Sequence, residues 1–139
     1  MNEEVLIREA LHAREQAYAP YSRFAVGAAL LCEDGRIFHG CNVENASFSP
    51  TCCAERVAIF RAVAEGVRSF RAIAVVGGPM GSSPSSLCTP CGVCRQVLSE
   101  FCGPDFEILL SDLSSPPKKY RLCELMPHAF SLERSNDEA

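Results

Sequence analysis

Three cysteines in two clusters are the residues of this chain whose types and spacing point most directly to chemistry. Cys53 begins the triplet Cys-Ala-Glu, and Cys91 and Cys94 lie in a later Pro-Cys-Gly-Val-Cys run. Catalytic zinc is typically held by three protein ligands, with the fourth position open to water. Glu55 follows the first cysteine by two residues and can move protons at that position. The pattern therefore predicts a zinc centre that activates water.

The charge of such a centre indicates what else it needs. Zn²⁺ bound by three thiolates has a net charge of minus one, which disfavours ionisation of its water. Helix N-termini carry partial positive charge that favours thiolates, and all three cysteines are expected at or near the starts of two helices. Arg56 is the nearest cation in the sequence, so we predict that it donates a hydrogen bond to a ligand sulfur.

The cysteines allow two other interpretations. A structural zinc site would need a fourth ligand, for which Cys52 or Cys88 is available. The Cys91 and Cys94 pair has the spacing of a redox motif. Neither interpretation gives Glu55 a role, and the side chains of adjacent cysteines such as Cys52 and Cys53 usually point apart. A catalytic zinc centre is therefore favoured.

Composition limits the class of protein. A length of 139 residues fits one domain, and a net charge of -4 disfavours a protein that grips nucleic acid through its phosphates. No apolar run approaches the roughly 20 residues that a membrane span needs. The acidic start of the chain is unlike a signal peptide. The nine cysteines are odd in number and four of them lie in two tight clusters, so they are best interpreted as reduced, which predicts a cytoplasmic protein.

Hydrophobic periodicity and turn residues predict helices and strands in alternation. Expected helices span Glu3 to Tyr18, Ala54 to Glu65 and Gly92 to Phe101. Expected strands span Ala25 to Cys32, Arg36 to Cys41, Ala72 to Val76, Glu107 to Leu110 and, more weakly, Tyr120 to Cys123. A loop is expected from Gly77 to Pro90, and Ile7, Leu11 and Tyr18 are expected on the buried face of the first helix.

These elements predict a single α/β domain. Its central sheet of about five strands should be mixed, because the first two strands form a hairpin, and helices should cover both faces. The zinc site should lie at the N-termini of two core helices. The domain is predicted to span residues 1–134, followed by a polar tail at 135–139.

Four motifs, in order along the chain, resemble the small homotetrameric cytidine deaminases. They are Tyr21 to Leu30, Gly40 to Ala46, Cys53 to Arg56, and Pro90 to Val97. The resemblance extends from about residue 5 to residue 131. It implies one zinc ion per subunit, held by Cys53, Cys91 and Cys94, with Glu55 as the proton shuttle.

The resemblance also implies a set of substrate contacts. Phe24 matches an aromatic wall against the nucleoside, and the Ala54 N–H matches a donor to the pyrimidine O2. Asn42 and Glu44 match the pair that binds the ribose 3′-hydroxyl. Phe130 matches a phenylalanine that covers the base in the site of a neighbouring subunit, which implies a homotetramer.

The implied function is hydrolytic deamination of cytidine and 2′-deoxycytidine to uridine and 2′-deoxyuridine, with release of ammonia, in pyrimidine salvage. Phe48 departs from the family pattern, because many members have tyrosine there. One alternative substrate is a nucleoside-like antibiotic such as blasticidin S. An alternative of another class is a zinc-stabilised RNA-binding or editing module, which the absence of basic runs disfavours.

Overall fold

The computed structural model describes residues 1–132, so the predicted tail and the domain boundary before it lie outside the described residues. The described part folds as four helices and five strands. In order they are α1 (Glu3–Arg14), β1 (Phe24–Cys32), β2 (Ile37–Cys41), α2 (Ala54–Ala64), β3 (Phe70–Pro79), α3 (Gly92–Phe101), β4 (Glu107–Leu110), β5 (Lys118–Arg121) and α4 (Leu122–Leu125). β1 and β2, and likewise β4 and β5, follow each other directly along the chain.

The five strands form one mixed sheet, as predicted, and their order in it is β2-β1-β3-β4-β5. β1 pairs antiparallel with both β2 and β3, and β4 pairs antiparallel with β5. Only β3 and β4 are parallel among these pairs, and α3 provides the crossover between them. The carboxyl end of β3 and the start of α3 therefore lie at the same end of the sheet.

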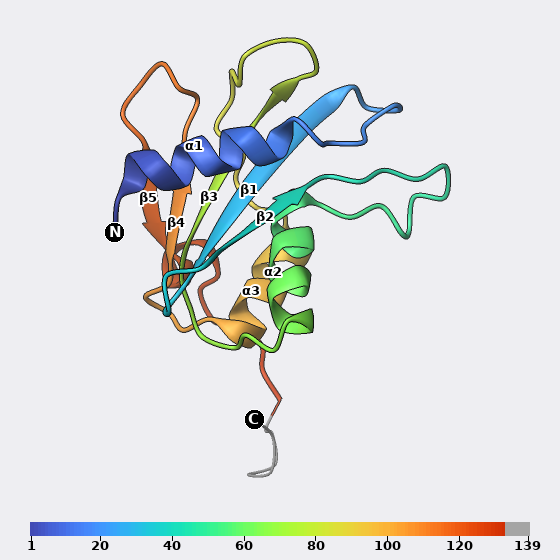
Figure 1. The fold of residues 1–139 in the computed structure, drawn as a ribbon. Helices are drawn as coiled ribbons and strands as arrows, with labels where there is room; N and C mark the ends of the chain where they lie inside the picture. Colours follow the sequence, from blue (N-terminus) through green and yellow to red (C-terminus); the bar gives the residue numbers. More distant parts are fainter. Residues whose placement is uncertain (133–139) are drawn as a thin grey trace.

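Helices cover both faces of the sheet, which confirms the predicted layers (Figure 1). On one face, α1 buries Leu6, Ile7 and Ala10 against side chains of the central strands. On the other face, α2 and α3 bury Ile59 and Leu98 in a larger cluster. The strands supply residues to both clusters because successive side chains point to opposite faces. None of the described helices is both long and apolar enough to cross a membrane.

The first helix is shorter than predicted, because α1 ends at Arg14 and not at Tyr18. Tyr18 is exposed, so its predicted place on the buried face is wrong. Its backbone instead pairs with the segment after β2, through Tyr18 N–H to Asn42 O at 2.9 Å and Glu44 N–H to Tyr18 O at 2.8 Å. These tertiary bonds take the chain out of the helix.

Several strand boundaries also differ from the prediction, among them the ends of β3 and β5. β3 continues to Pro79, because Gly77, Gly78 and Pro79 pair with the beginning of β1, so the loop starts later than expected. β5 ends at Arg121, and the short helix α4 begins where the strand was predicted to continue. Both differences lie at element ends, where sequence patterns are weakest.

Arg14 connects the end of α1 to the edge of the sheet near the start of β1. Its guanidinium donates to four carbonyl oxygens at 2.9 Å, those of Ala25, Gly78, Pro79 and Ser82. Three segments that are distant in sequence are thereby fixed together. A planar guanidinium with five donors is well suited to several acceptors at once.

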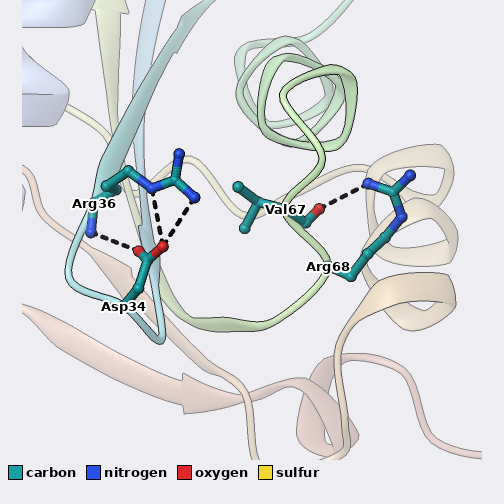
Figure 2. Close-up of polar contacts among 4 residues, drawn as sticks. All are labelled: Asp34, Arg36, Val67 and Arg68. Atoms are coloured by element: carbon teal, nitrogen blue, oxygen red, sulfur yellow. Dashed lines mark hydrogen bonds and ion pairs between the residues drawn. The ribbon is translucent and has the colours of Figure 1, made fainter. Parts of the chain in front are cut away.

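Two arginines form hydrogen bonds within turns at the opposite end of the sheet (Figure 2). In the turn between β1 and β2, Asp34 accepts from the backbone N–H of Arg36 at 3.0 Å and pairs with its guanidinium at 2.9 Å. These bonds hold the pKa of Asp34 below its usual value. After α2, Arg68 donates to the carbonyl of Val67 at 3.1 Å. Such exposed contacts stabilise little but help to define the turns.

Candidate metal centre and active site

The structure brings the three predicted ligands together. The Sγ atoms of Cys53, Cys91 and Cys94 all lie within 4.8 Å of one another. The Cys53–Cys91 separation is 3.9 Å, and the Cys91–Cys94 separation is 3.5 Å. Tetrahedral zinc with Zn–S bonds of about 2.3 Å places sulfurs about 3.8 Å apart. The sulfur positions therefore fit a zinc ion.

Two helix N-termini present these sulfurs, as predicted. Cys53 is the N-cap of α2, Cys91 is the N-cap of α3, and Cys94 lies in the first turn of α3. Neither N-cap side chain accepts a hydrogen bond from its own helix. The unpaired N–H groups of both first turns therefore contribute positive potential near the thiolates.

The surroundings of Cys53 favour the thiolate form of its sulfur. A hydrogen bond from the Cys94 thiol and a second from Arg56 lower the pKa of Cys53, although burial opposes them. Arg56 Nη2 lies 3.5 Å from this sulfur and 3.4 Å from the carbonyl of Thr51. The predicted contact between Arg56 and a ligand sulfur is thus present. The effect of Arg56 on zinc retention stays a prediction.

Glu55 lies in the first turn of α2, two residues after Cys53, and is buried. Burial raises the pKa of its carboxyl to about 7. A carboxyl group that is easily protonated and deprotonated near neutral pH suits general acid–base chemistry. It is one of only two buried polar or charged residues in the described chain, the other being Ser111. Its burial beside the sulfurs distinguishes it from a solvent-exposed helix residue.

The alternative of a four-cysteine structural site finds no support in residues 1–132. The group with metal-binding geometry contains neither Cys52 nor Cys88. Cys52 forms a bridge with Val43 through its backbone, and burial raises the pKa of its thiol. Burial likewise raises the pKa of Cys88. Three ligands leave one coordination position for water, which is the arrangement of catalytic zinc.

Close packing of α2 on β2 determines where Cys53 and Glu55 lie. A Cβ atom on Gly40 in β2 would lie 2.2 Å from the Ala54 carbonyl oxygen and 2.6 Å from the Ala58 nitrogen. Only glycine permits this approach. Ala54 is completely buried and opens α2, so its N–H has no acceptor within the helix and can bind a ligand.

Asn42 and Phe24, two predicted substrate residues, are tied to each other. The Asn42 side chain accepts from Val26 N–H at 2.9 Å and donates to the Phe24 carbonyl at 2.8 Å. Phe24 is the first residue of β1 and pairs with Pro79 at the end of β3. The side-chain amide of Asn42 therefore fixes the start of β1. Its second amide hydrogen takes part in neither bond.

Glu44 is held by the turn that precedes β1. Its Oε1 accepts from the N–H groups of Tyr21 and Ser22, each at 3.0 Å, and its Oε2 accepts from the Ser22 hydroxyl. These residues line a cavity of about 260 Å³ that also includes Phe48. The sequence analysis gave Ser22 no role. Its place in the Tyr21 to Leu30 motif was the available signal.

Phe130 follows α4 and has a side chain that is 65% exposed. Its carbonyl accepts from the Gln96 amide at 3.4 Å, and the residue lines a second cavity, of about 340 Å³, with Cys102 and Met126. None of these contacts involves the three-cysteine group. The predicted role of Phe130 in a neighbouring subunit stays a prediction.

Comparison with known proteins identifies the family. A family model for the cytidine and deoxycytidylate deaminase zinc-binding region matches residues 1–109. The chain belongs to this deaminase family. Cytidine deaminase of Sporosarcina psychrophila is 53% identical over 133 residues, covering 96% of this chain and 94% of the relative. Cytidine deaminase of Halalkalibacterium halodurans is 48% identical, covering 99% and 100%.

Solved structures agree with this assignment. A crystal structure of cytidine deaminase from Burkholderia pseudomallei has a TM-score of 0.85 and 48% sequence identity, covering 94% of this chain and 100% of that one. The predicted resemblance and fold class are therefore confirmed. The chain is a zinc-dependent deaminase, and the group of Cys53, Cys91 and Cys94 has the geometry to hold the ion.

Proposed function

We propose that this deaminase converts cytidine and 2′-deoxycytidine, with one water molecule, into uridine and 2′-deoxyuridine and ammonia. The observation that carries the proposal is the buried carboxyl of Glu55, two residues after Cys53 in a group of three cysteines whose sulfurs could hold a metal ion. Water activation and proton transfer are then possible at one point. Two cytidine deaminases with about half of their residues identical to this chain support the choice of substrate.

Different residues of the chain carry out different parts of the reaction. Zinc held by Cys53, Cys91 and Cys94 would supply Lewis acidity toward a water molecule. Glu55 accepts a proton from the water that attacks C4 of the pyrimidine and delivers it to N3. The same carboxyl passes the second water proton to the departing amine, which leaves as ammonia. One carboxyl group can do both because its ionised and protonated forms are close in free energy near neutral pH.

Substrate contacts orient C4 toward this point. The Ala54 N–H at the start of α2 donates to the pyrimidine O2, and Phe24 packs against the nucleoside. Asn42 and Glu44 bind the ribose 3′-hydroxyl. A 3′-phosphate would be repelled by the Glu44 carboxylate and could not donate to it, so free nucleosides are preferred over polynucleotides. The acidic net charge of -4 supports the same preference.

We further propose a cytoplasmic homotetramer that acts in pyrimidine salvage. Exposed aromatic side chains support an assembly, because Phe48 is 84% exposed and Phe130 is 65% exposed in the single chain. Burial of large aromatic groups is a common source of interface stability. In the tetramer, Phe130 of one subunit would cover the base bound by another.

The replacement Glu55→Gln tests the mechanism. The variant should still bind cytidine, but its turnover should fall by at least about 100-fold, because a general acid–base group is lost. Glu65→Gln, at the exposed C-cap of the same helix, is the matched control and should keep wild-type turnover. Near wild-type turnover by Glu55→Gln would refute the assignment.

Two measurements separate the alternative functions. Faster deamination of blasticidin S than of cytidine would favour the antibiotic substrate. Retardation of RNA in a gel shift, with no deamination of either compound, would favour an RNA-binding module. The proposal predicts cytidine as the better substrate and no RNA shift.

A further inference from the structure

We infer that Ser22 is a positioning residue that holds Glu44 and Phe24 in the arrangement needed to recognise the ribose 3′-hydroxyl. The inference deepens the proposed function and rests on it, because it assigns a specificity role within the same site. Ser22 touches neither the three-cysteine group nor Glu55 through any hydrogen bond among the described residues.

The hydroxyl of Ser22 links the two substrate residues directly. It donates to Oε2 of Glu44 and accepts from the backbone N–H of Phe24 at 3.1 Å. The backbone N–H of Ser22 also donates to Oε1 of Glu44, at 3.0 Å. Ser22 thus fixes both oxygens of one side chain and the backbone of the other. Loss of its hydroxyl would release Glu44 Oε2 and leave Phe24 N–H without this acceptor.

The bonds to Glu44 also limit what the carboxylate can still accept. Two oxygens offer about four acceptor positions. Oε1 is used twice, by the N–H groups of Tyr21 and Ser22, and Oε2 is used once, by the Ser22 hydroxyl. One acceptor position is left, on Oε2. The Ser22 hydroxyl therefore determines the direction from which a substrate donor approaches.

Asn42 supplies the complementary group. Its Oδ1 accepts from Val26 N–H and one of its amide hydrogens is donated to Phe24 O, which leaves one amide hydrogen. Together, Glu44 and Asn42 offer one acceptor and one donor. A hydroxyl group matches this pair because it can donate to Glu44 and accept from Asn42. A hydrogen, an ether or a phosphate cannot do both.

Local backbone preference does not hold Ser22 in place. The next residue, Arg23, has φ of 61°, in the left-handed region that non-glycine residues rarely adopt. The strained turn is held by a local bond from Arg23 N–H to Ala19 O at 3.0 Å and by a tertiary bond from Met80 N–H to Arg23 O at 2.8 Å. The hydrogen bonds that Glu44 accepts from Tyr21 and Ser22 also hold this turn. Backbone strain that surrounding hydrogen bonds maintain in this way is common at binding sites.

A role in stability alone would not explain the arrangement. Ser22 is exposed, so replacing it with alanine removes no core packing and leaves no cavity. Hydrogen bonds from Ser22 also keep the pKa of Glu44 below its usual value, which favours the charged acceptor. The expected consequence of losing the hydroxyl is thus a defect in ribose recognition.

The test compares Ser22→Ala with wild type on two substrates, cytidine and 3′-deoxycytidine. On cytidine, the variant should lose roughly tenfold in kcat/KM, the scale of one hydrogen bond to a charged group, mainly through a higher KM. On 3′-deoxycytidine, which has no hydroxyl for Glu44 to bind, the variant and wild type should agree within about twofold, because Asn42 and the pairing with Pro79 still hold Phe24. Ser22→Thr retains the hydroxyl and should restore most of the loss.

Ser69→Ala is the matched control, because Ser69 is an exposed serine just before the first residue of β3. It should match wild type on both substrates. A second measurement is a double-mutant cycle, in which Ser22→Ala should have little further effect in a Glu44→Gln background. This cycle remains informative if Ser22→Ala lowers the yield of folded protein.

The outcomes separate this inference from the proposed function. Equal losses on both substrates, or no loss on cytidine, would overturn the role of Ser22 while leaving cytidine deamination intact. A wild-type protein that uses both substrates equally well would also overturn it, because the 3′-hydroxyl would then not be recognised. A wild-type protein that deaminates neither substrate would contradict the proposed function itself.

Discussion

Gly40→Ala is expected to damage the active site more than the stability of the fold. The new Cβ would lie 2.2 Å from Ala54 O and 2.9 Å from Ala58 Cβ, whereas carbon atoms in contact normally lie about 3.5–4.0 Å apart. Because both atoms belong to α2, the helix must move away from β2 by about 1 Å to relieve the overlap. Cys53 and Glu55 would move with it.

The expected size of each effect follows from this displacement. Misplacement of catalytic groups by about 1 Å can reduce turnover by about 100-fold. Overpacking typically costs about 1–3 kcal/mol of the free energy of unfolding. Zinc per chain should also fall, because Cys53 moves with α2 while Cys91 and Cys94 stay on α3. The measurements are kcat/KM for cytidine, zinc content and urea unfolding.

Gly27→Ala is the matched control for the packing defect. Its Cβ would lie 2.1 Å from Ala10 O in α1, on the opposite face of the sheet. Gly27→Ala should lower the free energy of unfolding by about as much as Gly40→Ala does, but it should retain zinc. Gly103→Ala, which meets no atom within 4 Å, should resemble wild type in all three measurements. Wild-type zinc content and kcat/KM in Gly40→Ala would refute the reasoning.

Three further predictions concern single side chains. Arg56→Ala should lower zinc content or turnover, because the hydrogen bond to Cys53 Sγ at 3.5 Å is lost, and unchanged values of both would remove that role. Arg14→Ala should lower the free energy of unfolding by roughly 1–3 kcal/mol in urea titrations, because four carbonyl oxygens lose their donor, and Arg14→Lys should restore only part of it. Glu44 has a pKa below its usual value, mainly through the Ser22 hydroxyl, so its stabilising contribution should be complete above about pH 4.3 and decline as the pH falls further. Urea unfolding of wild type and Glu44→Gln between pH 7 and 3 measures this difference, and a difference that grows on acidification would contradict it.

The sequence predicted the metal centre well because its determinants are local. Cysteines at helix starts are recognisable from the adjoining apolar periodicity, and Glu55 lies within the same short motif as Cys53. The parts that escaped prediction depend on contacts between distant segments. Ser22 acquires its role only when the turn before β1 meets Glu44 after β2. Gly77 to Pro79 resemble a loop in sequence but form strand because β1 is there to pair with them.

Short elements were also difficult to predict. α4 has four residues, which is too few to show helical periodicity, and β5 before it has only one partly buried side chain, Tyr120. The end of α1 could not be placed from Tyr18, whose apolar ring fits the helical repeat. Its backbone bonds to Asn42 and Glu44 decide its position, and they belong to the tertiary fold.

A zinc centre formed by Cys53, Cys91 and Cys94, together with Glu55, is proposed to deaminate a free cytosine nucleoside. The most direct test follows the absorbance of cytidine after addition of purified protein that is zinc-replete, stripped by a chelator, or stripped and then given zinc. Cytidine absorbance should fall with the zinc-replete protein, remain almost unchanged with the stripped protein, and fall again once zinc is returned. No change with zinc-replete protein, or an equal rate without zinc, would contradict it.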